Sequence, residues 1–147
     1  MTDGPLHGVR VLDFTTLLPG PLATQFLAEA CATVLKIEPP GGDPVRHMGP
    51  HDAYGTSVPF RMLNRGKHLR TLDLKSANGR EQALGLARVA DVLVEQFRPG
   101  VMDRLGLGAA ALQAVNPRLI YCSITGYGQS GPRVDRVALE LRVGPVR

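Results

Sequence analysis

Short β-branched apolar runs alternate with segments of helical spacing along most of this 147-residue chain. Strand, tight loop, helix and strand follow one another within residues 9–38, which is the spacing of a right-handed βαβ unit. The pattern therefore predicts a parallel sheet. The predicted strands are residues 9–14, 33–38, 68–73, 91–95 and 118–125, and the predicted helical segments are residues 22–30, 60–67, 76–89 and 101–105, with one more ending at 112–115.

Two of the predicted helices show which face they should bury. In the first, Leu22, Phe26 and Ala30 share one apolar face. The helix of residues 76–89 should be capped by Ser76, whose side chain can accept a backbone N–H. Its expected inward positions are Ala83, Leu84, Ala87 and either Val89 or Ala90.

Residues 39–59 are rich in Pro, Gly, His and Asp and follow neither a helical nor a strand period. A long segment of this kind inside a domain is usually functional or mobile, so we expect no regular structure there. His47 and His51 lie four residues apart, but Pro50 intervenes and no Cys or acid completes a tetrahedral set. We therefore expect no metal site.

The composition is that of one soluble globular domain, with 44% hydrophobic and 20% charged residues. The net charge of +4 favours an anionic ligand, whereas the dispersed charges and the lack of Trp do not indicate nucleic-acid binding. Cys31 and Cys122 lie in apolar surroundings and are expected to be reduced core residues. Neither a membrane-spanning run nor a signal peptide is recognisable, so the expected location is cytoplasmic, away from membranes.

The end of the strand at residues 91–95 carries a candidate ligand site. Ligands of open α/β sheets bind outside the carboxyl ends of the strands. Phe97 could stack on a planar group there while Arg98 and Arg104 bind phosphate oxygens. The alternative is that Phe97 belongs to the core and that both arginines are solvated surface residues.

A second candidate follows the helical turn of residues 60–67, where Asn64, Arg65 and Lys67 could bind a purine edge and a phosphate. The alternative is a surface turn in which Asn64 bonds to the local backbone. A dinucleotide site after the first strand is not predicted, because Gly-Pro-Leu replaces the G-x-G-x-x-G pattern.

Five further stretches follow one another along the chain: LDFTTLLPGP, TVLKIEPPGGDPVR, MLNRGKHLRTLDLK, DVLVEQFRPGVMDRLGLG and NPRLIYCSITGYGQSGP. In this order they resemble the family III CoA-transferases, a group that includes formyl-CoA and carnitine-CoA transferases and α-methylacyl-CoA racemases. The resemblance covers residues 5–136. It implies the N-terminal part of a Rossmann-like large domain, an open parallel sheet with flanking helices, in a longer chain that forms an interlocked homodimer.

The resemblance also implies binding residues for CoA or acyl-CoA, which is a substrate, and no further cofactor. By this resemblance Leu17 and Leu18 line the nucleotide cleft, and Asn64 and Lys67 lie near the adenine and 3′-phosphate. The residues that grip the ADP part are Gln96, Phe97, Arg98 and Arg104. Pro39 stands where several members carry an arginine, so one expected phosphate contact lacks its side chain.

Residues 137–147 do not resemble the family and are expected to form a divergent, disordered tail. The family's catalytic aspartate, and the His and Asp pair of the racemases, follow this point, and Asp135 matches neither. We therefore expect a chain of this length, cut short by truncation or a frameshift, to bind CoA without transferring it. The alternatives are a fragment of a racemase-type enzyme and a non-catalytic CoA-binding remnant.

Overall fold

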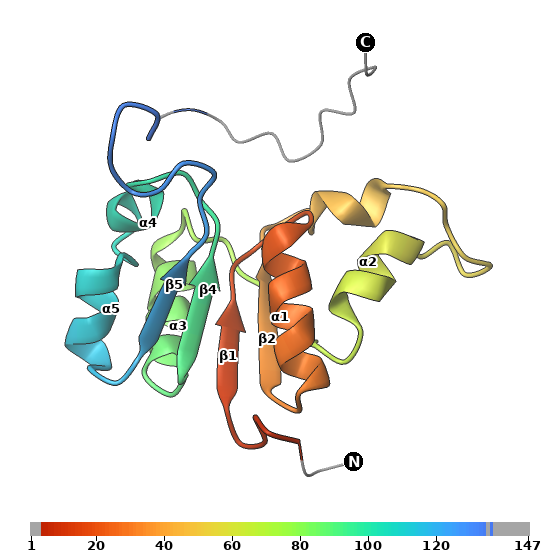
Figure 1. The fold of residues 1–147 in the computed structure, drawn as a ribbon, viewed down its shortest axis with the longest axis horizontal. Coiled ribbons are helices and arrows are strands. Elements are labelled where there is room, and N and C mark those ends of the chain that lie inside the picture. The colour runs from red at the N-terminus through yellow and green to blue at the C-terminus, as the bar shows by residue number, and fades with distance from the viewer. Residues whose placement is uncertain (1–3, 135, 137–147) are drawn as a thin grey trace.

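The computed structural model describes residues 4–134 and 136, in which five parallel strands form one sheet in the order β3-β2-β1-β4-β5 (Figure 1). This confirms the Rossmann-like open parallel sheet with flanking helices. The strands are β1 (Arg10–Asp13), β2 (Thr33–Glu38), β3 (His68–Thr71), β4 (Val92–Glu95) and β5 (Ile120–Ser123). The helices are α1 (Pro19–Glu29), the 3-10 helix η1 (Pro44–His47), α2 (Val58–Asn64), α3 (Ala77–Ala87), α4 (Val101–Arg104) and α5 (Ala109–Val115).

The strand order reverses between β1 and β4. From β1 the chain builds β2 and β3 toward one edge of the sheet, and β4 and β5 then extend it on the other side of β1. At such a reversal the loops after the two strands leave in opposite directions, and the crevice between them is the usual ligand site of an open α/β sheet. The fold therefore directs attention to the loops that follow Asp13 and Glu95.

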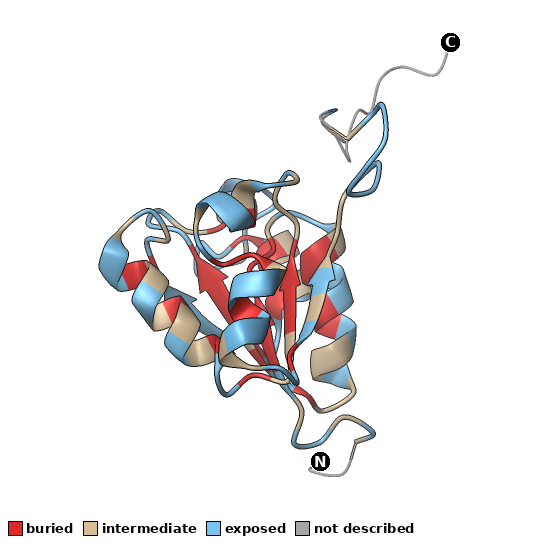
Figure 2. Cartoon of the chain, turned by 90° about the vertical axis from the view of Figure 1, so that its left-hand side faces the viewer, coloured by how far each residue is buried: buried red, intermediate tan, exposed pale blue. Residues whose placement is uncertain are grey.

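Apolar side chains fill both faces of the sheet. One cluster joins β1 and β4 to α3, α4 and α5, and a smaller cluster joins β1, β2 and β4 to α1. Figure 2 shows the buried positions concentrated along the strands and on the helix sides that face them. The cap predicted for α3 is confirmed, because the Ser76 hydroxyl accepts a hydrogen bond from Gly79 N at 2.9 Å. Ala83, Ala87 and Ala90 are buried as predicted, whereas Val89 is 54% exposed.

The buried face of α1 differs from the prediction. Leu22 and Phe26 are 38% and 61% exposed, while Thr24 and Gln25 are buried. The reason is a polar contact, since the Thr24 hydroxyl donates to Asp13 Oδ2 at 2.6 Å inside the protein. A buried carboxylate requires hydrogen-bond donors, so it draws the polar side of the helix inward.

Residues 39–59 contain more regular structure than expected. They form η1, an antiparallel bridge between His51 and Ser57, and the first turn of α2. Asp43 is fully buried and caps η1 by accepting from Val45 N at 3.0 Å. Arg46 binds both carboxylate oxygens of Glu38, at 2.8 and 3.0 Å. Side-chain contacts, rather than backbone periodicity, therefore fix this segment.

Cys122 is exposed and does not belong to the core, in contrast to the prediction. Its strand, β5, is an edge strand with exposed and half-buried positions in alternation. Cys31 is half-buried. In the described part of the chain no helix is long and apolar enough to cross a membrane. The predicted tail and Asp135 lie outside the described residues.

Two glycines of α3 give a matched test of packing. A Cβ at Gly79 would collide with the Asp73 carbonyl, whereas one at Gly85 would meet open space. We expect Gly79→Ala to lower the free energy of unfolding by about 1–3 kcal/mol, because the colliding atom is backbone. Gly85→Ala should raise it by about 0.5–1 kcal/mol through helix propensity. Urea unfolding checks both, and equal stability of the two variants would contradict the packing described.

Candidate functional site

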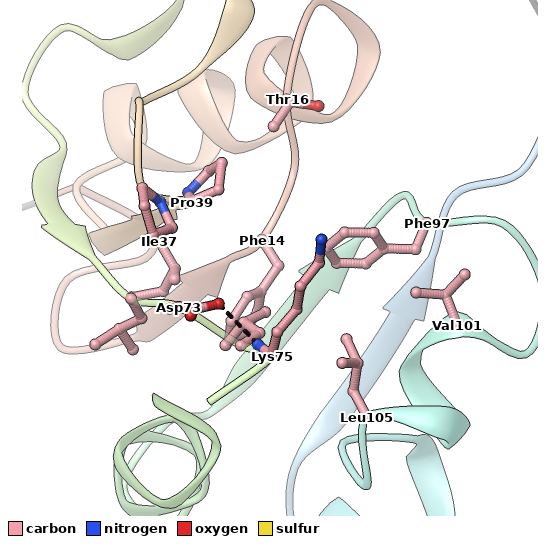
Figure 3. A pocket seen from close by; sticks show the side chains of 12 residues that line it. Phe14, Thr16, Ile37, Pro39, Asp73, Lys75, Phe97, Val101 and Leu105 are labelled. Carbon is pink, nitrogen blue, oxygen red and sulfur yellow. Dashed lines mark hydrogen bonds between the residues drawn. The ribbon is translucent and has the colours of Figure 1, made fainter. Parts of the chain in front are cut away.

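A cavity of about 510 Å³ opens at the carboxyl edge of the sheet, beside the strand reversal (Figure 3). Its apolar surface comes from the ends of β1, β2 and β3 and from α4. The apolar lining residues include Phe14, Ile37, Leu72, Phe97, Val101 and Leu105. Pro39 lines it as well, so the position at which an arginine was expected contributes apolar surface instead. A flat, mostly apolar group can be enclosed here.

The rim of this cavity is polar. Asp73 Oδ1 accepts a hydrogen bond from Lys75 N at 2.9 Å, which fixes the turn between β3 and α3. In Figure 3 the Lys75 side chain extends toward the Phe97 ring. Thr16 closes the rim on the side of the β1–α1 loop. A ring bound in the cavity would thus have a carboxylate for hydroxyl groups and an ammonium for an anionic group within the same rim.

A second cavity of about 420 Å³ includes Arg98 and Asp103 in its lining. Its buried carboxylate, Glu95, accepts hydrogen bonds from the Tyr121 hydroxyl at 3.2 Å and from Phe97 N at 2.7 Å. Burial, together with the Glu95 charge, raises the pKa of Tyr121 well above its ordinary value. The phenol therefore stays neutral and continues to donate to Glu95.

The structure separates the four ligand residues predicted around the end of β4. Phe97 lines the cavity of about 510 Å³, called the large cavity from here on, and Arg98 lines the second one. Arg104 is exposed on α4 and lines neither. The Gln96 amide is occupied within the protein, donating to Thr16 O at 2.6 Å and accepting from Gly20 N at 3.1 Å. A phosphate role for the two arginines stays a prediction.

Asn64 and Lys67 lie inside the protein rather than at a ligand surface. The Lys67 side chain is fully buried, with Nζ 3.2 Å from Asp13 Oδ2 and 2.8 Å from Thr24 Oγ1. Asn64 Oδ1 accepts from the same ammonium at 3.1 Å, and its Nδ2 donates to Phe60 O at 2.9 Å. The local backbone bond considered for Asn64 is thus confirmed. The geometry gives no support to a ligand contact by either residue.

A second buried ion pair lies beside the first. Lys36 Nζ is 2.9 Å from Asp43 Oδ2, and both side chains are fully buried. Lys36 also donates to Thr15 O at 2.6 Å, and Asp43 Oδ1 accepts from Leu17 N at 3.3 Å. Leu17 has a φ of 61°, in the left-handed region that a leucine rarely adopts. The two ion pairs therefore hold the β1–α1 loop in its shape.

Leu17 and Leu18 are 37% and 38% exposed, and neither lines either of the two cavities. Their role in a nucleotide cleft stays a prediction.

Sequence reasoning missed the turn of residues 72–75. This turn follows a parallel strand at the same sheet edge as Phe97. The expectation that ligands bind outside the carboxyl ends of the strands, which pointed to Phe97, therefore applies to this turn as well.

The N-terminus of α1 is a poor anion site. Pro19 and Pro21 have no backbone N–H, and Gly20 N donates to Gln96. Phosphate binding at the usual strand-to-helix turn needs free N–H groups, and this turn offers few. The start of α1 is therefore not where an anion would bind through backbone N–H groups. Within the described residues, His, Cys, Asp and Glu side chains form no cluster of three or more that could hold a metal ion.

A family model described as CoA-transferase family III matches residues 6–144, which extends past residue 136, where the resemblance was expected to end. The acetyl-CoA:oxalate CoA-transferase of Acetobacter aceti is 48% identical over 130 residues, covering 88% of this chain and 33% of that protein. The succinyl-CoA:glutarate CoA-transferase of Mus musculus is 42% identical over 137 residues, covering 92% and 31%. This chain thus spans about a third of the length of these relatives.

Solved structures of similar proteins also match this chain along most of its length. The crystal structure of Rv3272 from M. tuberculosis in its orthorhombic form superposes with a TM-score of 0.88 at 43% identity, covering 96% of this chain and 39% of that one. A CAIB/BAIF family protein from Brucella suis superposes with a TM-score of 0.86 at 42% identity, covering 90% and 36%. The likeness therefore extends over nearly the whole of this chain.

Burial lowers the pKa of Lys67 to about 8, because loss of water around the ammonium outweighs the attraction of Asp13. Between that pH and the ordinary value of 10.5 the folded chain binds fewer protons than the unfolded one, so this lysine makes stability rise with pH. We expect the Lys67 ¹³Cε resonance, assigned through the side chain from the backbone, to titrate with a midpoint of about 8. In the urea-unfolded control it should titrate at the ordinary value of 10.5. Equal midpoints in the two states would contradict the buried network.

Proposed function

The chain belongs to CoA-transferase family III, and from this we propose that the large cavity binds the adenosine end of CoA. The observation that supports the proposal is an apolar cavity with a polar rim at the strand reversal of an open parallel sheet. Adenine is planar and can be enclosed against Phe97, and the ribose hydroxyl groups can donate to Asp73. The phosphates would then lie outside the cavity mouth.

Three cations are available for those phosphates. Lys75, Arg98 and Arg104 are all exposed near this sheet edge, on the turn after β3, the turn after β4 and α4. A well-made charge-assisted bond contributes about 1.5–3 kcal/mol, and exposure to water reduces that value. In this proposal the cations orient CoA and attract it, while enclosure of the adenine excludes water.

We propose that the protein moves CoA between an acyl-CoA and a carboxylic acid, as the names of its relatives state for oxalate and glutarate. The described residues bind and orient CoA in this reaction and supply no catalytic group to it.

We also propose a cytoplasmic protein that acts as a homodimer. Support for a dimer comes from Leu22 and Phe26, apolar residues exposed on α1 in the single chain.

Calorimetry of CoA binding tests the cation roles. Lys75→Ala and Arg104→Ala should each weaken binding several-fold, and up to about a hundredfold, because each removes a charge beside a phosphate. Added salt should weaken binding of the wild type more than that of either variant. Arg118→Ala is the matched control, because Arg118 is an exposed arginine that precedes β5, at the sheet edge away from the cavity. This variant should bind CoA like the wild type. Unchanged affinity in both cation variants would overturn the assignment.

The cavity itself is tested by filling it. Val101→Trp places a large ring where the adenine would lie and changes no charge. We expect it to bind CoA at least about tenfold more weakly, because an occupied cavity cannot enclose a second ring. Urea unfolding of the variant serves as the control for folding. A folded Val101→Trp variant with wild-type affinity would show that the adenosine end binds elsewhere.

A further inference from the structure

One side chain bridges the strand reversal. Gln96 follows β4, and its amide bonds to the β1–α1 loop and to the start of α1, donating to Thr16 O at 2.6 Å and accepting from Gly20 N at 3.1 Å. These partners lie 80 and 76 residues away in the sequence. Because an amide presents its donor and acceptor side by side, one residue can hold both the loop at Thr16 and the start of α1 at Gly20.

The bridge joins two walls of the large cavity. Thr16 and Phe97, the neighbour of Gln96 in the chain, both line that cavity. A Cβ at Gly20 would crowd both Gln96 Oε1 and the Thr15 side chain, so the bridge depends on a glycine at the start of α1. The spacing between the two walls is thus set by a contact that lies outside the cavity.

The rest of the loop is fixed by other groups. Asp13 accepts from Thr15 N at 2.9 Å, Lys36 donates to Thr15 O, and Asp43 accepts from Leu17 N. Among the hydrogen bonds of the described residues, the one from Gln96 fixes the carbonyl of Thr16. Removal of Gln96 should therefore release Thr16 while the loop on either side of it stays anchored.

We propose that Gln96 is a positioning residue for nucleotide binding, acting through Thr16 and Phe97 and not through contact with CoA. One N–H of its amide and the amide oxygen are already bonded within the protein, and Gln96 does not line the large cavity. This differs from the role implied by family resemblance, in which Gln96 grips the ADP part. The proposal rests on the proposed function, because it assumes that the large cavity holds the adenosine end.

Two variants separate the bridge from side-chain volume. Gln96→Met keeps the length of the side chain without its hydrogen bonds, and Gln96→Ala removes both. Gln113→Ala on α5, at an exposed position outside both cavities, is the matched control. Without any ligand, hydrogen exchange at the Gly20 amide should be protected in the wild type and accelerated at least about tenfold in both Gln96 variants. Rapid exchange in the wild type would overturn the bridge.

Calorimetry with CoA then tests the positioning role. Each Gln96 variant should weaken CoA binding about tenfold in the wild-type background, but at most about twofold when combined with Phe97→Ala, because the wall it positions has then been removed. An equal, roughly tenfold loss of CoA affinity in both backgrounds would indicate a direct contact between Gln96 and CoA and refute the proposal. Unchanged CoA affinity of the single Gln96 variants would also refute it. No binding of CoA by the wild type would instead refute the proposed function, while the exchange result would still report on the bridge.

Discussion

Burial of two lysines and two aspartates under the carboxyl edge of the sheet is the constraint on which the local structure depends. The side chains of Asp13, Lys36, Asp43 and Lys67 are all fully buried. A buried charge without a partner costs several kcal/mol, so each carboxylate must lie against an ammonium and accept further hydrogen bonds. Lys36 pairs in register with Asp13 across β2 and β1, which places the two ion pairs next to each other. The loops that supply the remaining partners are held by this requirement.

The buried charges therefore prepare the site before any ligand is present. They fix the β1–α1 loop through Thr15 and Leu17, and this loop carries Thr16, one wall of the large cavity. A preformed cavity loses less conformational entropy on binding than a flexible one. The same arrangement leaves the N-terminus of α1 without free donors, since Gln96 occupies Gly20 N. The start of α1 is consequently a poor site for an anion.

The sequence predicted the elements well because its apolar runs are short and separated by Gly and Pro, and the Ser76 cap was recognisable from its residue type. It failed where polar groups are buried. Hydrophobic patterning placed Phe26 inward, whereas the buried carboxylate of Asp13 draws Thr24 inward instead. Lys67 was predicted to contact a phosphate because a single sequence does not reveal whether the partner of a cation is a ligand or a carboxylate within the fold.

The large cavity was only partly predictable for a related reason. Phe97 was found because it follows a strand with a recognisable apolar run, but the turn after β3 was assigned to the strand itself, and Lys75 was passed over. Exposed cations orient a phosphate through water-screened charge, whereas enclosure of a purine removes apolar surface from water at about 25 cal/mol per Å². In the adenosine site that we propose, the apolar walls and the exposed cations would contribute to affinity in these two different ways. Gln96, which we propose as a positioning residue, would then influence affinity without contacting CoA.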